Sequence, residues 1–325
     1  MRRRTLGRTG ISVSEIGFGG WGIGKSMWGR TDDAESLRAL HAALEAGIDY
    51  FDTAFAYGHG HSERLIARTL KESGRRATVS TKIPPKNMEW PAHPWTALAL
   101  AFPPDWIVSC VERSLRNLAT DCLTLEQFHV WTDNWLRDPL WPEVAATFEG
   151  LKKEGKLRFV GASINSDDPD SALGLVASGL VDQVQVLFNL FDQRAADRLL
   201  PLCAEKGVAV VVRCPFDEGG LTGELRPHTK FEPEDFRSHY FAGERLAETC
   251  RRAAALEKAA LGPKAPSLAI AALKYCLSFA AVSTVIPGMR KASHVLQNIQ
   301  ASDGNYYDPE ELEALRAHRW IRNFY

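Results

Sequence analysis

The sequence predicts an α/β protein in which eight strands and eight helices alternate to form a (β/α)8 barrel. Short apolar runs and amphipathic stretches follow one another eight times along the 325 residues, as expected for parallel strands joined by helical crossovers. Hydrophobic residues make up 45% and charged residues 24% of the chain, which is typical of a globular protein. Because such barrels commonly take about 250 residues or more around one core, we expect a single domain over residues 1–325.

Eight apolar runs have the length and composition of strands that are buried on both faces of a sheet. They are Glu15–Trp21, Asp49–Phe55, Ala77–Ile83, Cys122–His129, Arg158–Ser163, Val181–Asn189, Val208–Pro215 and Val282–Pro287. Their regular alternation with helical segments predicts a TIM barrel.

Helix signals lie between these runs. The first helix is expected to begin at Asp32, which stands in capping-box spacing with Glu35, and to end at Gly47. The other helices are expected near Glu63–Glu72, Pro104–Leu118, Pro142–Glu154, Pro169–Ser178, Ala195–Glu205, Ser267–Leu277 and Ser293–Gln300.

Three segments fall outside the eightfold repeat. An N-terminal β-hairpin is predicted around Leu6–Val13, and an extra C-terminal helix near Pro309–His318. The long segment Leu221–Gly262 is expected to contribute a large loop and one further helix, and loops of that length are usually functional or mobile. Because chemistry in such barrels gathers where strands end and loops begin, polar residues at the strand ends are the candidates for a site.

Charge and cysteine usage narrow the class of protein. Lysine and arginine number 39 and aspartate and glutamate 40, so no net field draws the chain toward nucleic acid or an anionic membrane. Met1–Arg4 is basic but lacks a following apolar signal core, and no run approaches about 18 apolar residues. Six cysteines form no CxxC pair, so reduced thiols are expected. These features predict a cytoplasmic protein that acts on a small molecule, and they leave its oligomeric state open.

Four polar residues stand at three successive predicted strand ends. Asp52 and Tyr57 follow the second strand, Lys82 ends the third and His129 ends the fourth. A phenol with a pKa of about 10 is a weak proton donor, so we expect Lys82 to lower the pKa of Tyr57 while Asp52 pairs with Lys82. His129 is expected to hydrogen-bond a substrate oxygen. Singly, these residues are also typical of a packed tyrosine, a surface lysine and a core histidine; together they predict proton transfer to a carbonyl oxygen.

The run Asp52-x-x-x-x-Tyr57-Gly58, followed by Lys82 and His129, resembles the catalytic tetrad of the aldo-keto reductases, and the similarity extends over nearly the whole chain. The resemblance implies a barrel that binds NADP(H) as cofactor and reduces an aldehyde or ketone to an alcohol, with Tyr57 as general acid. Potassium-channel β subunits resemble the same family, so an NADPH-binding regulatory or sensor subunit is an alternative. An imine reductase, and an alcohol or sugar dehydrogenase working in the opposite direction, are further alternatives.

By the same resemblance, residues at later strand ends hold the nicotinamide. Ser163, Asn165 and Gln185 are expected at its carboxamide, although Ile164 intervenes where many relatives place the Asn directly after the Ser. Arg213 stands where many relatives stack a Tyr on the nicotinamide ring. Because a guanidinium is repelled by a positively charged ring, we expect Arg213 to favour NADPH over NADP⁺.

Two segments are expected at the phosphates. Glycines after the seventh strand let backbone amides approach a pyrophosphate. After the eighth strand, Arg290 precedes a helix, and a helix N-terminus beside a cation is an anion site, so the adenosine 2′-phosphate of NADP(H) is expected there. The remaining expected cofactor residues are Gly20, Trp21, Asp52, Pro215, Phe216, Gly219, Leu221, Gly223, Gly288, Met289, His294, Gln297 and Asn298.

Tryptophans in the loops after the first, third and fourth strands are expected to line a pocket for a partly apolar carbonyl compound. They are Trp28, Trp90 and Trp131; pinning long loops onto the barrel is the alternative role for them. No metal site is expected, because His59 and His61 lack a third clustered ligand.

Overall fold

The computed structural model describes residues 1–25, 27–29 and 31–325 of the chain. Its centre is a sheet of eight parallel strands that follow one another in chain order. The strands are β3 (Phe18–Gly19), β4 (Tyr50–Asp52), β5 (Thr78–Ile83), β6 (Leu123–Trp131), β7 (Leu157–Ile164), β8 (Gln183–Leu187), β9 (Ala209–Arg213) and β10 (Val282–Val285). Each overlaps the apolar run that predicted it, and the predicted fold class is confirmed.

The first and last strands meet, so the sheet closes into a barrel. Ile16 pairs with Val285, and Gly19 pairs with Gly288, in parallel bridges. Glycine is required at position 19 because a Cβ atom there would lie 2.7 Å from the carbonyl oxygen of Ile286. Closure leaves the sheet without an open edge.

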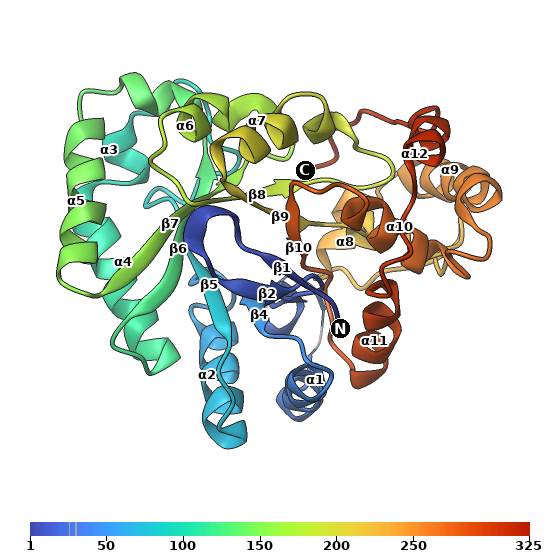
Figure 1. The fold of residues 1–325 in the computed structure, drawn as a ribbon, viewed down its shortest axis with the longest axis horizontal. Coiled ribbons are helices and arrows are strands. Elements are labelled where there is room, and N and C mark those ends of the chain that lie inside the picture. Colours follow the sequence, from blue (N-terminus) through green and yellow to red (C-terminus); the bar gives the residue numbers. More distant parts are fainter. Residues whose placement is uncertain (26, 30) are drawn as a thin grey trace.

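A helix follows each strand and covers the outside of the barrel (Figure 1). These helices are α1 (Asp33–Glu45), α2 (His61–Ser73), α4 (Pro104–Leu118), α5 (Trp141–Lys153), α6 (Leu173–Ala177), α7 (Leu199–Lys206), α10 (Leu268–Leu277) and α11 (Ala292–Asn298). Asp32 caps α1 as predicted, but its side chain accepts from the Ala34 amide rather than from that of Glu35. Within the described ranges, every helix falls short of the length and apolar character that a membrane crossing requires.

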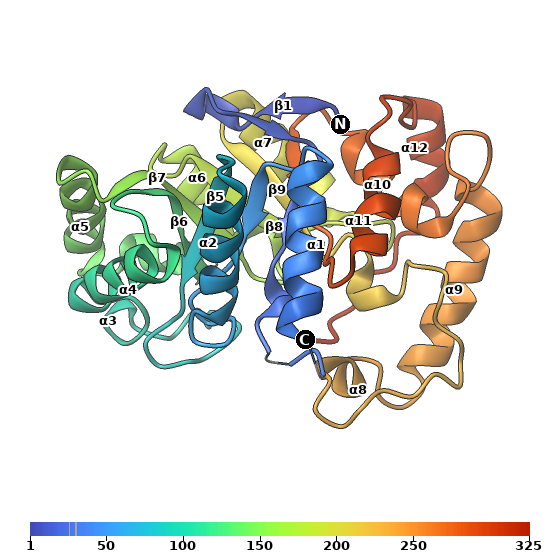
Figure 2. The same ribbon diagram turned by 90° about the horizontal axis from the view of Figure 1, so that it is seen from below.

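The core has two layers. Most buried apolar side chains lie between the sheet and the surrounding helices. A smaller apolar cluster fills the end of the barrel at which the strands begin. There Leu6 and Val13 of the N-terminal segment, both fully buried, pack against Tyr50. The predicted hairpin is present as β1 (Arg3–Thr5) and β2 (Ser12–Ser14), so the predicted range covers mostly its turn. Figure 2 shows this hairpin across the end of the barrel at which the strands begin.

The opposite end of the barrel carries the longest connections. After β9 the chain forms the short helix α8 (Phe236–Tyr240) and then α9 (Arg245–Ala260), the further helix predicted in this segment. Helix α12 (Pro309–Arg316) is the predicted C-terminal helix, and a complete capping box of Asp308 and Glu311 begins it. Figure 2 shows α8 and the C-terminal residues at the end remote from the hairpin, where the strands finish.

Candidate active site

The carboxyl ends of β4, β5 and β6 bring the four candidate residues together. Lys82 is fully buried, and its Nζ lies 2.7 Å from Asp52 Oδ2 and 3.3 Å from the Tyr57 hydroxyl. The ring of His129 is perpendicular to that of Tyr57, with the ring centroids 5.9 Å apart. The sequence-predicted constellation is therefore one contiguous cluster in the structure.

Hydrogen bonds with Thr53 and Gln185 hold Lys82 and Asp52 in place. Lys82 Nζ also donates to the Thr53 carbonyl oxygen at 2.7 Å, and Gln185 Nε2 donates to Asp52 Oδ1 at 2.6 Å. Burial lowers the pKa of Lys82 and raises that of Asp52, while the attraction between the two charges opposes both shifts. A buried pair with these additional hydrogen bonds has one fixed geometry.

The pKa of Tyr57 departs from the expectation. Burial and the negative charge of Asp52 raise the pKa of the phenol well above its ordinary value, whereas a lowering by Lys82 was expected. The physical reason is that the ammonium is closer to Asp52 than to Tyr57, so the carboxylate neutralises much of its field. The phenol therefore keeps its proton, which is the state that a proton donor needs before reaction.

His129 is a neutral imidazole that faces the same space. Burial and the nearby cations Lys82 and Arg213 lower the pKa of His129 well below its ordinary value. Its Nδ1 is buried and has no hydrogen-bond partner among the described residues. Because buried polar atoms are normally paired, this nitrogen is a candidate for contact with a ligand. Trp90 Nε1 donates a hydrogen bond to the backbone carbonyl oxygen of His129 at 2.9 Å.

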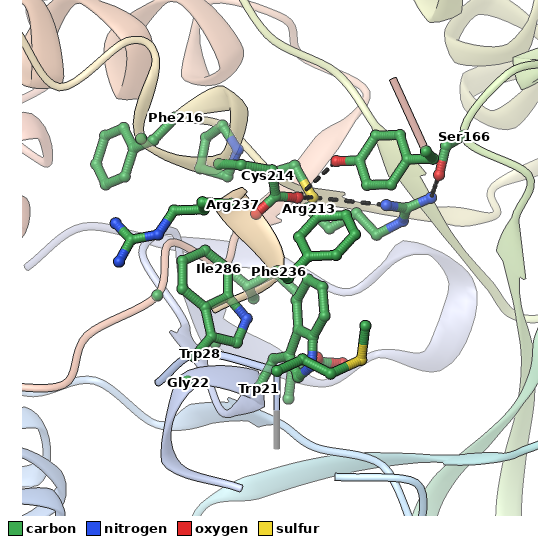
Figure 3. A pocket seen from close by; sticks show the side chains of 18 of the residues that line it. Trp21, Gly22, Trp28, Ser166, Arg213, Cys214, Phe216, Phe236, Arg237 and Ile286 are labelled. Atoms are coloured by element: carbon green, nitrogen blue, oxygen red, sulfur yellow. Dashed lines mark hydrogen bonds between the residues drawn. The ribbon is translucent and has the colours of Figure 1, made fainter. Parts of the chain in front are cut away.

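A cavity of about 890 Å³ extends from the tetrad across the ends of β7 to β10. Figure 3 shows Trp21, Arg213 and Phe216 among the side chains that line it. Most of the expected cofactor residues line it: Trp21, Asp52, Ser163, Asn165, Gln185, Arg213, Pro215, Phe216, Gly219, Gly288, Arg290, His294, Gln297 and Asn298. Four do not. Leu221 and Met289 are fully buried in the core, Gly20 donates its N–H to Asp52 O at 2.8 Å, and Gly223 lies outside the cavity wall.

The three residues expected at a nicotinamide carboxamide all line the cavity. Ser163 and Gln185 are buried and line the cavity. Asn165 also lines it, but its amide is committed elsewhere: Oδ1 accepts from Ala92 N at 2.9 Å and Nδ2 donates to Ala92 O at 3.1 Å. Asn165 therefore fastens the loop after β5 to the barrel, and its contact with the carboxamide stays a prediction.

Arg213 lies in the cavity wall with its guanidinium anchored on β7. Nη2 donates to the Ile164 carbonyl oxygen at 3.0 Å and to Ser166 Oγ at 2.9 Å. Figure 3 shows the bond to Ser166 and the contact with Cys214. The positive charge of Arg213 reaches the tetrad, since it contributes to lowering the pKa of both Lys82 and His129.

The far end of the cavity is cationic. Arg290, Lys291 and His294 line it at the start of α11, and Arg290 Nη1 donates to the Trp28 carbonyl oxygen at 2.8 Å. Asn298 Nδ2 is buried there without a hydrogen-bond partner among the described residues. An unpaired buried donor and the two cations Arg290 and Lys291 at one end, with amide-binding groups at the other, fit an elongated anionic dinucleotide.

The three tryptophans expected in a substrate pocket divide into two groups. Trp28 and Trp90 line the cavity. Trp131 does not: it is fully buried and packs against Phe128, Trp135 and Trp141. The structure thus corrects the expectation for Trp131, which has the alternative role of pinning a loop.

The sequence did not indicate how the loops after β3 and β9 meet over the cavity. Phe236 N donates to the Met27 carbonyl oxygen at 2.6 Å, and Trp28 forms an antiparallel bridge with Asp235. Arg237 then lies over the Trp28 ring, with 5.1 Å between the guanidinium and the ring centroid. In the sequence, only the length of the segment after β9 indicated a functional role for it, and that length did not identify these residues.

The histidines considered as metal ligands have other contacts. His61 Nε2 lies 2.9 Å from Asp33 Oδ1, and the ring of His59 packs edge-on against Phe55. In the part of the chain that the structure describes, no group of three or more His, Cys, Asp or Glu side chains is arranged to hold a metal ion.

Three kinds of comparison relate the chain to known proteins. The sequence model of the Aldo/keto reductase family matches residues 15–319. Aldo-keto reductase YhdN of Bacillus subtilis (strain 168) is 32% identical over 325 residues, which cover 97% of this chain and 93% of that protein. The holo form of an aldo-keto reductase from Bacillus halodurans is similar with a TM-score of 0.76 and 28% identity, covering 99% and 97% of the two chains. A glycerol dehydrogenase from Gluconobacter oxydans has a TM-score of 0.78 and 27% identity, covering 97% and 94%.

Proposed function

Because the chain belongs to the aldo/keto reductase family, we propose that it is an NADPH-dependent oxidoreductase that reduces an aldehyde or ketone to an alcohol. The observation that carries the proposal is one buried ammonium in contact with both a carboxylate and a phenol: Lys82 Nζ is 2.7 Å from Asp52 and 3.3 Å from Tyr57. This contact stands at the wall of a cavity with room for a dinucleotide. The six free cysteines fit a single-domain protein of the reducing cytoplasm.

Each member of the tetrad has one task in this proposal. NADPH, when bound, supplies the hydride for the carbonyl carbon. Tyr57 donates its proton to the carbonyl oxygen, and Lys82 stabilises the phenolate that remains. Asp52 keeps Lys82 charged and aimed. His129, as a neutral imidazole, donates a hydrogen bond to the same oxygen and stabilises the negative charge that develops on it.

NADPH consumption with a panel of aldehydes and ketones tests the proposal. We expect turnover with at least one carbonyl compound and none without it. Binding of NADPH without turnover of any substrate would instead support a regulatory or sensor subunit. Turnover confined to imines would support an imine reductase.

Alcohol oxidation is the second candidate function, because the similar structure from Gluconobacter oxydans is a glycerol dehydrogenase. Oxidation requires the phenolate of Tyr57 as a base. Burial and Asp52 raise the pKa of Tyr57 well above its ordinary value, so the free chain holds the acid form near neutral pH. This favours reduction, and a higher kcat/KM for an alcohol with NADP⁺ than for its carbonyl partner with NADPH would reverse the assignment.

Arg290 is proposed to select NADPH over NADH by pairing with the 2′-phosphate. We expect Arg290→Ala to raise the Kd of NADPH by roughly 10- to 100-fold, since hydrogen bonds to charged groups contribute about 1.5–3 kcal/mol, and to leave the Kd of NADH nearly unchanged. Titration of protein fluorescence with both cofactors measures this. Arg251→Ala, an exposed arginine of α9, is the matched control. Equal losses of affinity for the two cofactors would contradict the role.

Arg213 is proposed to disfavour NADP⁺ because its charge, anchored on β7, repels a positively charged ring. We expect Arg213→Tyr to lower the ratio of the Kd of NADP⁺ to that of NADPH by roughly fivefold, in keeping with a screened interaction of about 1 kcal/mol. Ser166→Ala is the control, since it removes a hydrogen bond of the guanidinium and keeps its charge. A ratio that does not change in Arg213→Tyr would refute the proposal.

A further inference from the structure

The loop after β9 has an unusual backbone conformation. Cys214, Asp217 and Glu218 all have positive φ angles, of 51°, 52° and 54°. A Cβ atom crowds the neighbouring carbonyl oxygen in this left-handed region, so residues other than glycine adopt it at a cost. Three such residues within five positions require surroundings that hold them in place.

Side chains from a distant part of the sequence provide this support. Asp217 is buried, and its Oδ1 accepts hydrogen bonds from the hydroxyl of Tyr240 at 2.9 Å and from Arg322. Glu218 accepts from the hydroxyl of Tyr325 at 2.5 Å. Two of the three strained residues are thus bonded to the segment Trp320–Tyr325.

The segment Trp320–Tyr325 is itself fixed to the body of the barrel. Trp320 N donates to the Phe191 carbonyl oxygen at 2.8 Å. The guanidinium of Arg322 lies over the Trp320 ring at 4.3 Å and over the Phe191 ring at 5.0 Å, and only 7% of its side chain is exposed. The contact with Asp217 therefore joins the loop to a rigid support rather than to a free tail.

The supported loop is part of the cavity described above. Cys214, Phe216, Glu218 and Gly219 line that cavity, and so does Tyr325 itself; Figure 3 shows Cys214 and Phe216 in its wall. The second carboxylate oxygen of Asp217 is buried without a partner among the described residues, and the positive charge of Arg322 opposes the rise that burial causes in the pKa of this carboxylate. Removal of that charge leaves a buried acid unpaired, which favours opening of the loop toward water.

We propose that the segment Trp320–Tyr325 is a latch that holds the loop Cys214–Gly220 in its binding conformation, with Arg322 and Tyr325 as positioning residues for NADPH. The identity of the bound ligand, NADPH, rests on the proposed function. Its effect falls on cofactor affinity and release, because neither Arg322 nor Tyr325 contacts the tetrad side chains through a hydrogen bond in the described structure.

The experiment compares Arg322→Met with Arg319→Met. Methionine retains an apolar side chain against the aromatic rings while removing the charge, and Arg319 bonds Asp197 at the surface instead of the loop. Hydrogen exchange of residues 214–225 in the free chain should become at least tenfold faster in Arg322→Met. The Kd of NADPH should rise at least tenfold. Arg319→Met should change both quantities less than twofold.

Two additional variants keep the test decisive. The double variant Asp217→Asn/Arg322→Met leaves no unpaired charge at position 217, so it should fold even where Arg322→Met does not, and its loop should still exchange faster than that of the unaltered chain. Tyr325→Phe removes the hydroxyl that donates to Glu218 and should have a smaller effect of the same sign. Exchange rates and NADPH affinities equal to those of Arg319→Met in these variants would overturn the latch. An unaltered chain that binds no NADPH would overturn the proposed function, while the exchange rates would still decide the latch.

Discussion

Tyr57→Phe is expected to lower kcat for carbonyl reduction by about 10²- to 10⁴-fold, the usual effect of removing a general acid. The variant lacks only the hydroxyl. The aromatic ring keeps its contacts with Trp21, at 6.2 Å between ring centroids, and with His129, at 5.9 Å. We therefore expect the Kd of NADPH to stay within about twofold, so that the loss lies in the proton transfer step.

Tyr50→Phe is the matched control for this experiment. Tyr50 belongs to the same strand as Asp52, points into the barrel and donates its hydroxyl to Gln183 Oε1 at 2.9 Å, but it does not line the cavity. Loss of the Tyr50 hydroxyl should lower the free energy of unfolding by about 0.5–1.5 kcal/mol and should leave kcat nearly unchanged. If Tyr57→Phe kept more than about a tenth of the activity, the proton would have to come from another group, and the proposed role of Tyr57 would be wrong.

The parts of the structure that the sequence predicted well are those that one physical rule determines. Strands of a closed parallel barrel are buried on both faces, so each appears in the sequence as a short continuous apolar run. The polar residues at the ends of those runs, Asp52, Lys82 and His129, then had to face one another, because the carboxyl ends of the strands meet at one mouth. This geometry depends only on the order of the strands.

Trp131 shows where this reasoning fails. Side chains alternate along a strand, so Trp131 should face the same side as His129. The pairing of β6 with β7 instead shifts between these residues: His129 pairs with Ser163, and Trp131 with the next residue, Ile164. Such an irregularity reverses the alternation and turns Trp131 toward the helices, where it packs on Phe128. No local sequence signal marked this shift.

The tetrad electrostatics and the loops were hard to predict for a different reason. The sequence placed an ammonium beside a phenol, but the sign of the effect on the pKa of Tyr57 depends on how Lys82 divides its contacts between Tyr57 and Asp52. Likewise, Asn165 has the right residue type for a carboxamide contact, and only the tertiary structure shows that its amide also bonds the backbone of Ala92.

The buried pair of Asp52 and Lys82 leads to a second prediction, in which the same substitutions have different effects on stability and on kcat. Both side chains are nearly inaccessible, at 4% and 0% exposure, so solvent does not screen either charge. Lys82→Met should leave Asp52 as an unpaired buried carboxylate and destabilise the fold by about 3–5 kcal/mol. Asp52→Asn should act similarly through Lys82, although the Thr53 carbonyl and the Tyr57 hydroxyl still contact the ammonium.

The double variant Asp52→Asn/Lys82→Met contains neither charge, and replacement of a buried ion pair by neutral side chains of similar size is often nearly neutral for stability. We expect denaturant unfolding to give a free energy within about 1 kcal/mol of the unaltered chain, while kcat stays at least about 10²-fold reduced because the ammonium that contacts the Tyr57 hydroxyl is gone. A double variant as unstable as the sum of the two single variants would show that the charges are not coupled. Recovered activity in that variant would remove Lys82 from the proton transfer, since the buried charge would then serve the fold alone.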